Sequence, residues 1–351
     1  MSFERDNIKR MAGYASGEQP DDTDTIKLNT NENPYPPSPK ALAALADGAA
    51  RLNRYPDPVA SGVRIAAAEL YGLASPDWVL VGNGSDDLLT IAVRSFVGEG
   101  ETLACLEPSY SLYPVLSAIQ DATCRLVPLT PDFGLPDDLA AQAAGAKLFF
   151  LTNPNAPTGN AFPVDQVERF CREFEGVVLI DEAYADFAEG SCLALVEKLP
   201  NVIVSRTLSK GYGLAGIRLG VALGNPDLIE GMMKVKDSYN VNALSQAVGE
   251  AALRDQEWLR ETRAKVIATR QRVAGELEAL GFSMTTSATN FLFVKPPMAA
   301  AAYFEALRER AIVIRYFPGP VTGDWVRVTV GTDEEMDAYL AATREILGDG
   351  A

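Results

Sequence analysis

The 351-residue sequence contains no histidine. Without imidazole, the chain cannot form a Ser-His-Asp or Cys-His nucleophile, a histidine-ligated metal or a histidine general base. Its four cysteines are widely spaced and form no C-x-x-C pair, so they predict neither a zinc ribbon nor a disulfide framework. We expect no metal, and any enzymatic acid–base chemistry must come from Lys, Asp, Glu or Tyr.

Positive charge and long apolar runs are also scarce. Lys and Arg total 31 against 47 Asp and Glu, which gives a formal net charge of −16. Such a balance argues against nonspecific binding to nucleic acid or anionic membranes. No apolar run reaches membrane-spanning length, and the first residues lack the apolar core of a signal peptide. We therefore expect a cytoplasmic protein with no nucleic-acid or membrane partner.

One stretch combines a strand-like apolar run with reactive and anion-binding groups. The run 202–205 is followed by Thr207, Ser209, Lys210 and, eight residues later, Arg218. A partly desolvated lysine at a strand end has a lowered pKa, so its free amine can form a Schiff base with an aldehyde. The hydroxyls and the guanidinium suit a phosphate. Pyridoxal 5'-phosphate (PLP) carries both an aldehyde for the lysine and a phosphate for the hydroxyls and guanidinium. The alternative is that these charges are solvated surface groups.

The same stretch contains a G-x-G-x-x-G pattern at Gly211, Gly213 and Gly216. In dinucleotide-binding proteins this pattern requires a helix directly after the glycines, with its N-terminus facing the pyrophosphate. Residues 217–223 predict another strand instead and leave no room for that helix. We interpret the pattern as coincidental.

Two further strand ends carry candidate groups. The segment Gly82-Asn83-Gly84-Ser85-Asp86 joins a strand to a helix. We expect Ser85 or Asp86 to cap this helix, and its free N–H groups can also bind a phosphate. Asp181 follows the apolar run 177–180, where it either caps the next helix or keeps a pyridine nitrogen protonated. Tyr184 would then reach the phenolic oxygen of the ring, and Tyr110 would stack on the ring or belong to the core.

Arg315 and Arg327 each lie within a β-branched apolar run. An arginine in such a run needs an anionic partner if it faces inward, whereas it is solvated if it lies on the outer face of an alternating strand. Two inward arginines would form an anion clamp for the substrate.

The overall pattern predicts an α/β fold. Apolar runs alternate with helical patterns, which is typical of a mostly parallel sheet covered by helices on both faces. We expect an N-terminal arm and substrate loop at 1–40, a large cofactor-binding domain at 41–245 and a smaller α+β C-terminal domain at 246–351. The expected strands are 78–81, 102–106, 123–129, 147–151, 177–180, 202–205 and 219–223, then 290–295, 312–316 and 325–330, with a last helix at about 333–347.

In this order, a series of short motifs resembles the fold-type I pyridoxal-phosphate aminotransferases, and among them the histidinol-phosphate aminotransferase family. The motifs span nearly the whole chain. They are Asn31-Glu32-Asn33-Pro34-Tyr35, Arg54-Tyr55-Pro56-Asp57, Gly82-Asn83-Gly84-Ser85-Asp86, Pro108-Ser109-Tyr110, Asn153-Pro154-Asn155-Ala156-Pro157-Thr158-Gly159, Asp181-Glu182-Ala183-Tyr184, Arg206-Thr207-Leu208-Ser209-Lys210 and Arg327-Val328-Thr329-Val330-Gly331-Thr332.

The resemblance implies a role for each matching residue. Lys210 would be the catalytic Schiff-base lysine, and Tyr55 would reach the phosphate of the neighbouring subunit, so a homodimer is implied. The implied cofactor-binding residues are Tyr55, Gly84, Ser85, Asp86, Tyr110, Asn155, Asp181, Tyr184, Thr207, Ser209, Lys210 and Arg218. The implied substrate-binding residues are Tyr14, Asn33, Arg315 and Arg327.

One position departs from the family pattern. The family usually has asparagine directly before the Pro-Thr-Gly, where it helps to hold the phenolic oxygen of the cofactor, and this chain has Ala156. Either Asn155 substitutes for it or Tyr184 acts alone.

The activity implied by the resemblance is a ping-pong amino transfer through Lys210. Glutamate would give its amino group and leave as 2-oxoglutarate, and imidazole-acetol phosphate would receive it in histidine biosynthesis. Three alternatives stay open: an aminotransferase for aromatic amino acids, a PLP-dependent decarboxylase of the threonine-phosphate type, and a noncatalytic cofactor-binding sensor. Sensors of this kind are usually fused to a DNA-binding domain, for which the short N-terminus leaves no room.

Overall fold

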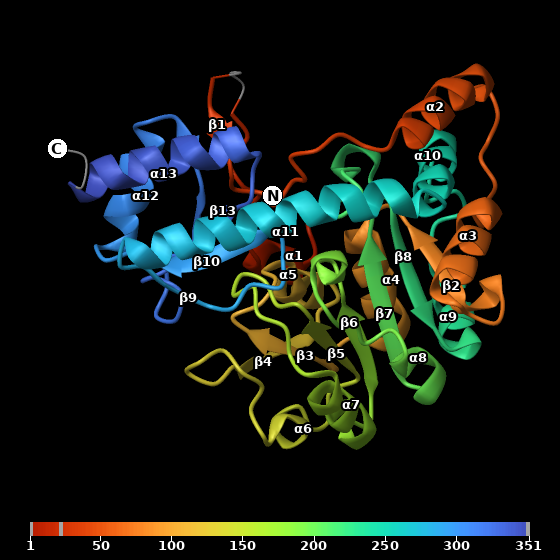
Figure 1. The fold of residues 1–351 in the computed structure, drawn as a ribbon. Helices are drawn as coiled ribbons and strands as arrows, with labels where there is room; N and C mark the ends of the chain where they lie inside the picture. Colours follow the sequence, from red (N-terminus) through yellow and green to blue (C-terminus); the bar gives the residue numbers. More distant parts are fainter. Residues whose placement is uncertain (1–2, 21–23, 349–351) are drawn as a thin grey trace.

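The computed structural model describes residues 3–20 and 24–348. In this part of the chain, the main sheet has seven strands in the order β2-β8-β7-β6-β5-β3-β4 (Figure 1). β8 runs antiparallel to both of its neighbours, and the other pairs are parallel. The strands are β2 Val79–Gly82, β3 Thr102–Glu107, β4 Thr123–Pro128, β5 Leu148–Thr152, β6 Val177–Asp181, β7 Val202–Thr207 and β8 Gly220–Gly224. Each lies within two residues of its predicted position.

Both faces of this sheet are buried, because successive side chains of a strand point to opposite faces. On β5, Phe149 and Leu151 pack into one layer, whereas Leu148 and Phe150 pack into the other. The first layer is closed by α6 Leu139–Gln142, α7 Val164–Glu173 and α8 Leu195–Lys198, and the second by α4 Ser85–Phe96, α5 Leu112–Ile119 and α9 Pro226–Met233. The expected sheet with helices on both faces is confirmed.

A third group of helices covers β2 and β8. It consists of α2 Pro39–Gly48, α3 Ser61–Tyr71 and α10 Ala243–Leu253, with short 3-10 turns at η1 Ala49–Arg51 and η2 Pro76–Trp78. α2 begins where Ser38 Oγ accepts a hydrogen bond from the Ala41 N–H and proline occupies the first helical position. Because α10 packs on α2 and α3, we propose that the large domain ends after α10 rather than within it at residue 245.

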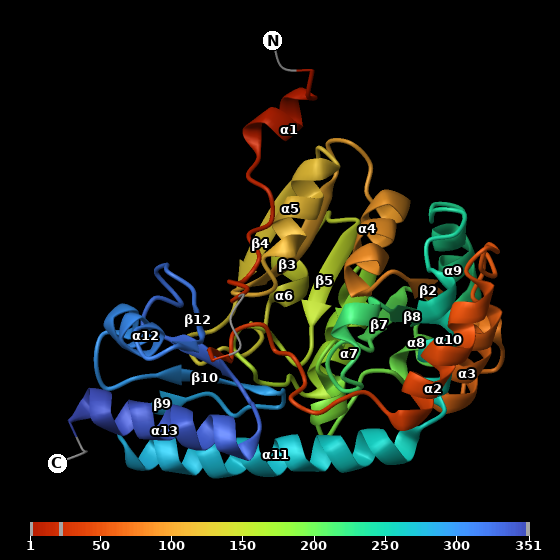
Figure 2. The same ribbon diagram turned by 90° about the horizontal axis from the view of Figure 1, so that it is seen from above.

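The C-terminal part forms a second, antiparallel sheet. Its strands, in order, are β12 Arg315–Tyr316, β13 Val326–Thr329, β10 Phe291–Lys295 and β9 Ser283–Met284. α12 Ala300–Arg308 and α13 Asp333–Leu347 pack on it, and α13 begins with the Thr332–Glu335 capping box. The long helix α11 Gln256–Ala279 runs from α10 to this second sheet along one side of the molecule (Figures 1 and 2).

The N-terminal segment contains two short regular elements, α1 and β1. α1 Asp6–Arg10 lies against α5, where Asn7 Nδ2 donates to the Ala118 carbonyl at 2.9 Å. β1 Ile26–Lys27 pairs in parallel with β11 Ile312–Val313. The predicted strand 312–316 is therefore wrong as one element, because its first half joins β1 and its second half, β12, joins β13.

Two local features complete the description. Gly216 lies within the 3-10 turn η4 Ala215–Ile217, and β8 follows that turn without an intervening α-helix. A further 3-10 turn, η3 Ala185–Phe187, follows β6. The glycine pattern thus has no helix to place against a pyrophosphate. In the described part of the chain, every helix is too short or too polar to cross a bilayer.

Candidate active site

A cavity of about 270 Å³ lies at the carboxyl ends of the parallel strands, with β12 and β13 on its other side. This is where ligands bind in parallel α/β sheets. Most of the residues predicted from the sequence line it, namely Tyr14, Ser85, Asp86, Tyr110, Asp181, Tyr184, Thr207, Ser209, Lys210, Arg218, Arg315 and Arg327.

Lys210 follows β7 and reaches into this cavity. Its Nζ donates to the Thr30 carbonyl oxygen at 3.0 Å. Burial, followed by the positive charge of Arg327, lowers the pKa of Lys210 to about 8. A substantial fraction of this amine is therefore uncharged, and thus nucleophilic, at a slightly alkaline pH.

Asp181, the last residue of β6, has only neutral hydrogen-bond partners. Its carboxylate accepts from Tyr113 Oη at 3.0 Å, from Ser205 Oγ at 3.2 Å and from the Ala183 N–H at 3.2 Å. Within residues 3–20 and 24–348, no Lys or Arg forms an ion pair with it. Burial raises the pKa of Asp181 to about 6. A buried carboxylate without a cation is suited to a cationic ligand group.

Tyr14, Tyr110 and Tyr184 line the same cavity as Asp181. Tyr184 Oη accepts from Asn31 Nδ2 at 2.8 Å, and burial raises the pKa of Tyr184. Tyr110 Oη donates to Asp86 Oδ1 at 3.2 Å, and its ring makes an edge contact with Tyr14. An apolar wall with hydroxyls at its rim suits a flat aromatic ligand with polar substituents.

The predicted phosphate site lies at one end of the cavity. Arg218 Nη1 donates to Ser209 Oγ at 3.3 Å, and Thr207 Oγ1 donates to the same oxygen at 3.0 Å. α4 begins beside them at Ser85, and its N-cap is Gly84 with no side-chain hydrogen bond, so the predicted cap by Ser85 or Asp86 is wrong. The N–H groups of its first turn stay available. Gly84 has a φ of +85°, and a Cβ there would lie 2.5 Å from Arg218 Nη2. This glycine therefore lets the guanidinium lie close to the helix start.

Arg315 and Arg327 lie side by side at the other end, as register partners on β12 and β13. Arg327 donates from Nη2 to the Asn29 carbonyl at 2.9 Å, and its guanidinium lies over two phenylalanine rings. Its buried Nε has no hydrogen-bond partner, and burial lowers the pKa of Arg327. Among the residues that the structure describes, no carboxylate pairs with either arginine. Two adjacent cations without a counter-charge form an anion site.

Four predicted residues do not line the cavity. Asn155 is fully buried and holds its own loop by donating to the Pro108 carbonyl and to Thr158, so this geometry does not support it as a substitute at position 156. Asn33 donates to the carbonyls of Lys210 and Gly211, which fixes the lysine turn. Gly84 leaves room for the Arg218 guanidinium, as described above. Tyr55 is 83% exposed and stacks on Tyr239.

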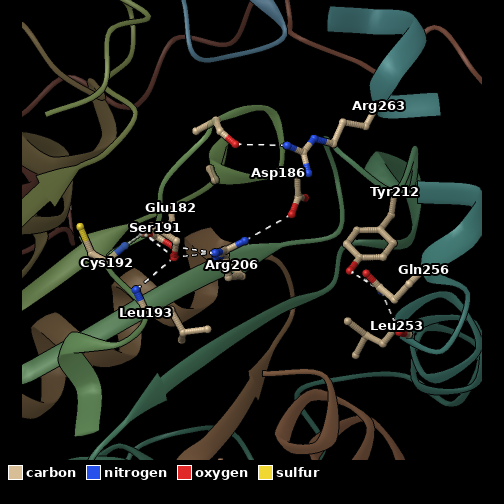
Figure 3. A network of polar contacts seen from close by, with 12 residues as sticks. Glu182, Asp186, Ser191, Cys192, Leu193, Arg206, Tyr212, Leu253, Gln256 and Arg263 are labelled. Carbon is tan, nitrogen blue, oxygen red and sulfur yellow. Dashed lines mark hydrogen bonds and ion pairs between the residues drawn. The ribbon is translucent and has the colours of Figure 1, made fainter. Parts of the chain in front are cut away.

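A second polar network surrounds Arg206 (Figure 3). Arg206 Nη2 lies 2.8 Å from Glu182 Oε2, and Arg206 Nη1 lies 3.3 Å from Asp186 Oδ1. Ser191 Oγ also donates to Glu182. None of these side chains lines the cavity, and sequence reasoning did not single them out.

These features define a class of enzyme. The family model for aminotransferase class I and II matches residues 23–343, and the chain belongs to this family. It is a transaminase of fold type I.

Two named relatives and one solved structure are similar to this chain over nearly its whole length. The chain is 46% identical to the histidinol-phosphate aminotransferase of Rhodopirellula baltica, over 96% of this chain and 93% of that protein. It is 45% identical to histidinol-phosphate aminotransferase 1 of Trichormus variabilis, over 99% of both. A solved structure of the histidinol-phosphate aminotransferase from Sinorhizobium meliloti in complex with pyridoxal-5'-phosphate superposes with a TM-score of 0.91 at 28% identity, covering 100% of this chain and 99% of that one.

Proposed function

We propose that this protein is a PLP-dependent aminotransferase that moves an amino group between glutamate and imidazole-acetol phosphate, forming histidinol phosphate in histidine biosynthesis. The observation that carries the proposal is the pair Arg315 and Arg327, which line the same cavity as Lys210 and have no carboxylate partner within the part of the chain that the structure describes. The names of relatives 45–46% identical over nearly the whole chain support the choice of substrate.

The residues present fit the cofactor. The unpaired carboxylate of Asp181 suits a protonated ring nitrogen, and Tyr184 is within the same cavity for the phenolic oxygen. Ser209, Thr207, Arg218 and the start of α4 form a donor set for a phosphate. Bound PLP supplies a carbonyl for the lysine amine and a ring that stabilises negative charge at the substrate α-carbon.

The chain's own residues account for the rest of the reaction. The Lys210 amine, with a pKa of about 8, accepts and returns the proton at the substrate α-carbon. Arg315 and Arg327 bind the carboxylate of glutamate and the phosphate of the second substrate in turn, because both anions match the guanidinium fork. One anion site that serves two substrates in succession agrees with ping-pong transfer.

We propose a homodimer as the working unit. Tyr55 lies outside the cavity and is largely exposed, as is its stacking partner Tyr239 at 47%. Exposed Leu42 and Leu52 lie in the same region of the chain. In a dimer, Tyr55 of the partner subunit would complete the phosphate site.

The test is a half-reaction. Histidinol phosphate is added without any acceptor to protein loaded with PLP, and the visible absorbance is followed. We expect a rapid, stoichiometric loss of the visible band. If phenylalanine or tyrosine removes the band and histidinol phosphate does not, the enzyme is an aromatic aminotransferase. Release of carbon dioxide from a threonine-phosphate substrate would instead establish the decarboxylase.

A further inference from the structure

The Tyr184 hydroxyl is held from behind by Asn31, a residue to which sequence reasoning assigned no role. Asn31 is buried, with an exposed fraction of 1%, and lines the cavity. Its Nδ2 donates to Tyr184 Oη at 2.8 Å. Ala156, at the position where the family usually has asparagine, lines the same cavity. Tyr184 is therefore supported by an amide from a different part of the chain.

The hydrogen bonds around Asn31 have a defined direction. Thr329 Oγ1 accepts from the Asn31 backbone N–H at 3.0 Å and donates to Asn31 Oδ1 at 3.1 Å. With Oδ1 bonded to the Thr329 hydroxyl, the NH₂ end of the amide faces Tyr184 Oη. The amide can only donate there, so the proton of Tyr184 must point elsewhere. Tyr184 lines the cavity, so its proton can point into that space.

The backbone of Asn31 is fixed as firmly as its side chain. Its carbonyl accepts from Asn290 Nδ2 at 2.9 Å, and the preceding carbonyl, of Thr30, accepts from Lys210 Nζ. Its φ is +56°, a left-handed conformation that asparagine tolerates better than most residues. A single turn thus holds both the lysine amine and the tyrosine hydroxyl.

We propose that Asn31 is a positioning residue that turns the Tyr184 proton toward the phenolic oxygen of the cofactor, and so takes over support that position 156 no longer gives. A hydroxyl whose oxygen accepts a hydrogen bond is also a stronger donor, because the two bonds polarise each other. The inference rests on the proposed function. The other titratable groups that interact with Tyr184 are Arg327, Asp181, Tyr14 and Tyr110.

The test is the pH titration of the visible absorbance of PLP-loaded protein without substrate. A proton donated to the phenolic oxygen favours the deprotonated form of the lysine–cofactor linkage, so losing it raises the midpoint. Asn31→Gly removes the amide without charge and without straining a positive φ. We expect it to raise the midpoint by on the order of 0.5–1 pH unit, in the same direction as Tyr184→Phe.

The double variant provides the matched control. In the Tyr184→Phe background, Asn31→Gly should change the midpoint by no more than about 0.3 pH unit, because the group through which it acts is gone. An equal shift in both backgrounds, or no shift in the single variant, overturns the inference. Thr329→Val, which releases the amide without reaching the cavity, should raise the midpoint less; if Asn31→Gly does not fold, an unchanged midpoint in Thr329→Val overturns it.

Failure of the proposed function can be distinguished from failure of this inference. A wild-type protein that forms no visible band with PLP contradicts both the function and the inference. A wild-type protein that responds to histidinol phosphate, with variants that leave the midpoint in place, contradicts the inference alone.

Discussion

Two neighbouring carboxylates at the end of β6 have opposite surroundings. Glu182 turns away from the cavity and meets Arg206, Ser191 and the Cys192 N–H. Asp181 turns into the cavity and meets only neutral donors. Both are at most 3% exposed, so burial does not distinguish them. The difference lies in whether the chain itself supplies the counter-charge.

The same contrast holds for two arginines. Arg206 pairs with Glu182 and Asp186, whereas Arg327 lies over aromatic rings and binds a backbone carbonyl. A paired buried charge depends on its partner for stability, and removing one partner leaves the other uncompensated. An unpaired buried charge costs stability in the free protein and is compensated when a ligand supplies the opposite charge. Among these buried groups, the network around Arg206 is therefore structural, and the unpaired Asp181 and Arg327 mark the ligand site. Arg218 and Asp86, which also line the cavity, form a half-exposed ion pair at 3.3 Å and lie outside this contrast.

The largest expected effect comes from Lys210→Ala. Removing the amine should lower turnover on the order of 10⁴-fold or more, because both the covalent link and the proton transfer are lost. Stability should not fall at pH 7, since a buried lysine whose pKa is lowered to about 8 is costly to hold in its charged form. Steady-state rates and urea unfolding measure the two quantities. Full activity in this variant would end the Schiff-base account.

The second effect concerns the paired network. Arg206→Met should lower the free energy of unfolding by about 3–5 kcal/mol, because Glu182 and Asp186 lose their counter-charge in the interior. Arg172→Met is the matched control: Arg172 pairs with Glu168 at 2.6 Å on the surface of α7, and its loss should cost about 0.3–0.5 kcal/mol. Equal losses of unfolding free energy in the two variants would show that the buried network stabilises the fold no more than a surface ion pair does.

Local sequence signals pointed to the residues on one side of this contrast. Asp181 directly follows an apolar run, Arg327 interrupts one and Lys210 comes five residues after the run 202–205, so each was identified from a short window of sequence. The strands of the main sheet were predicted for the same reason. A charge in such a place needs an explanation even before the fold is known.

The partners of these residues were not predictable. Tyr113 is 68 residues from Asp181, and Asn31 is 153 residues from Tyr184. Such pairs exist only once the sheet brings distant segments together, and nothing in the local pattern of Asn31 distinguishes it from a loop asparagine. β1 was missed for a related reason, since two residues show no periodicity and their strand conformation depends on pairing with β11.

A third prediction concerns pH and the unpaired carboxylate. The pKa of Asp181 is raised to about 6 in the folded protein, above its unfolded value of about 3.9. The folded state therefore binds more protons between these two values, and the free energy of unfolding falls as the pH rises through them. Asp181→Asn removes this cost. Without cofactor, the variant should be more stable than wild type by about 1 kcal/mol at pH 4.5 and about 3 kcal/mol at pH 7.5.

Urea unfolding of both proteins at the two pH values measures this difference. Other groups that titrate in this range contribute to both proteins, so they cancel in the comparison. The same substitution should reduce turnover by about 10²–10³-fold, because the charge aimed at the ring nitrogen is lost. A variant less stable than wild type at pH 7.5 would place Asp181 with Glu182 among the structural carboxylates.

The smallest expected effect is that of Arg315→Met. Arg315 is half-buried and donates to the Ala15 and Ser16 carbonyls at 3.4 Å each, so its removal should change the free energy of unfolding by less than about 0.5 kcal/mol. The KM for histidinol phosphate should rise about tenfold, because one charge-assisted contact to the substrate anion is lost. The KM for glutamate should rise less, since a carboxylate carries less charge than a phosphate and Arg327 remains. Unfolding curves and steady-state kinetics with both substrates separate these effects. The contrary outcome is a loss of stability comparable to that of Arg206→Met, with KM unchanged. It would mean that an arginine without a carboxylate partner can stabilise the fold as much as a paired one. The contrast between paired and unpaired charges would then no longer identify the site.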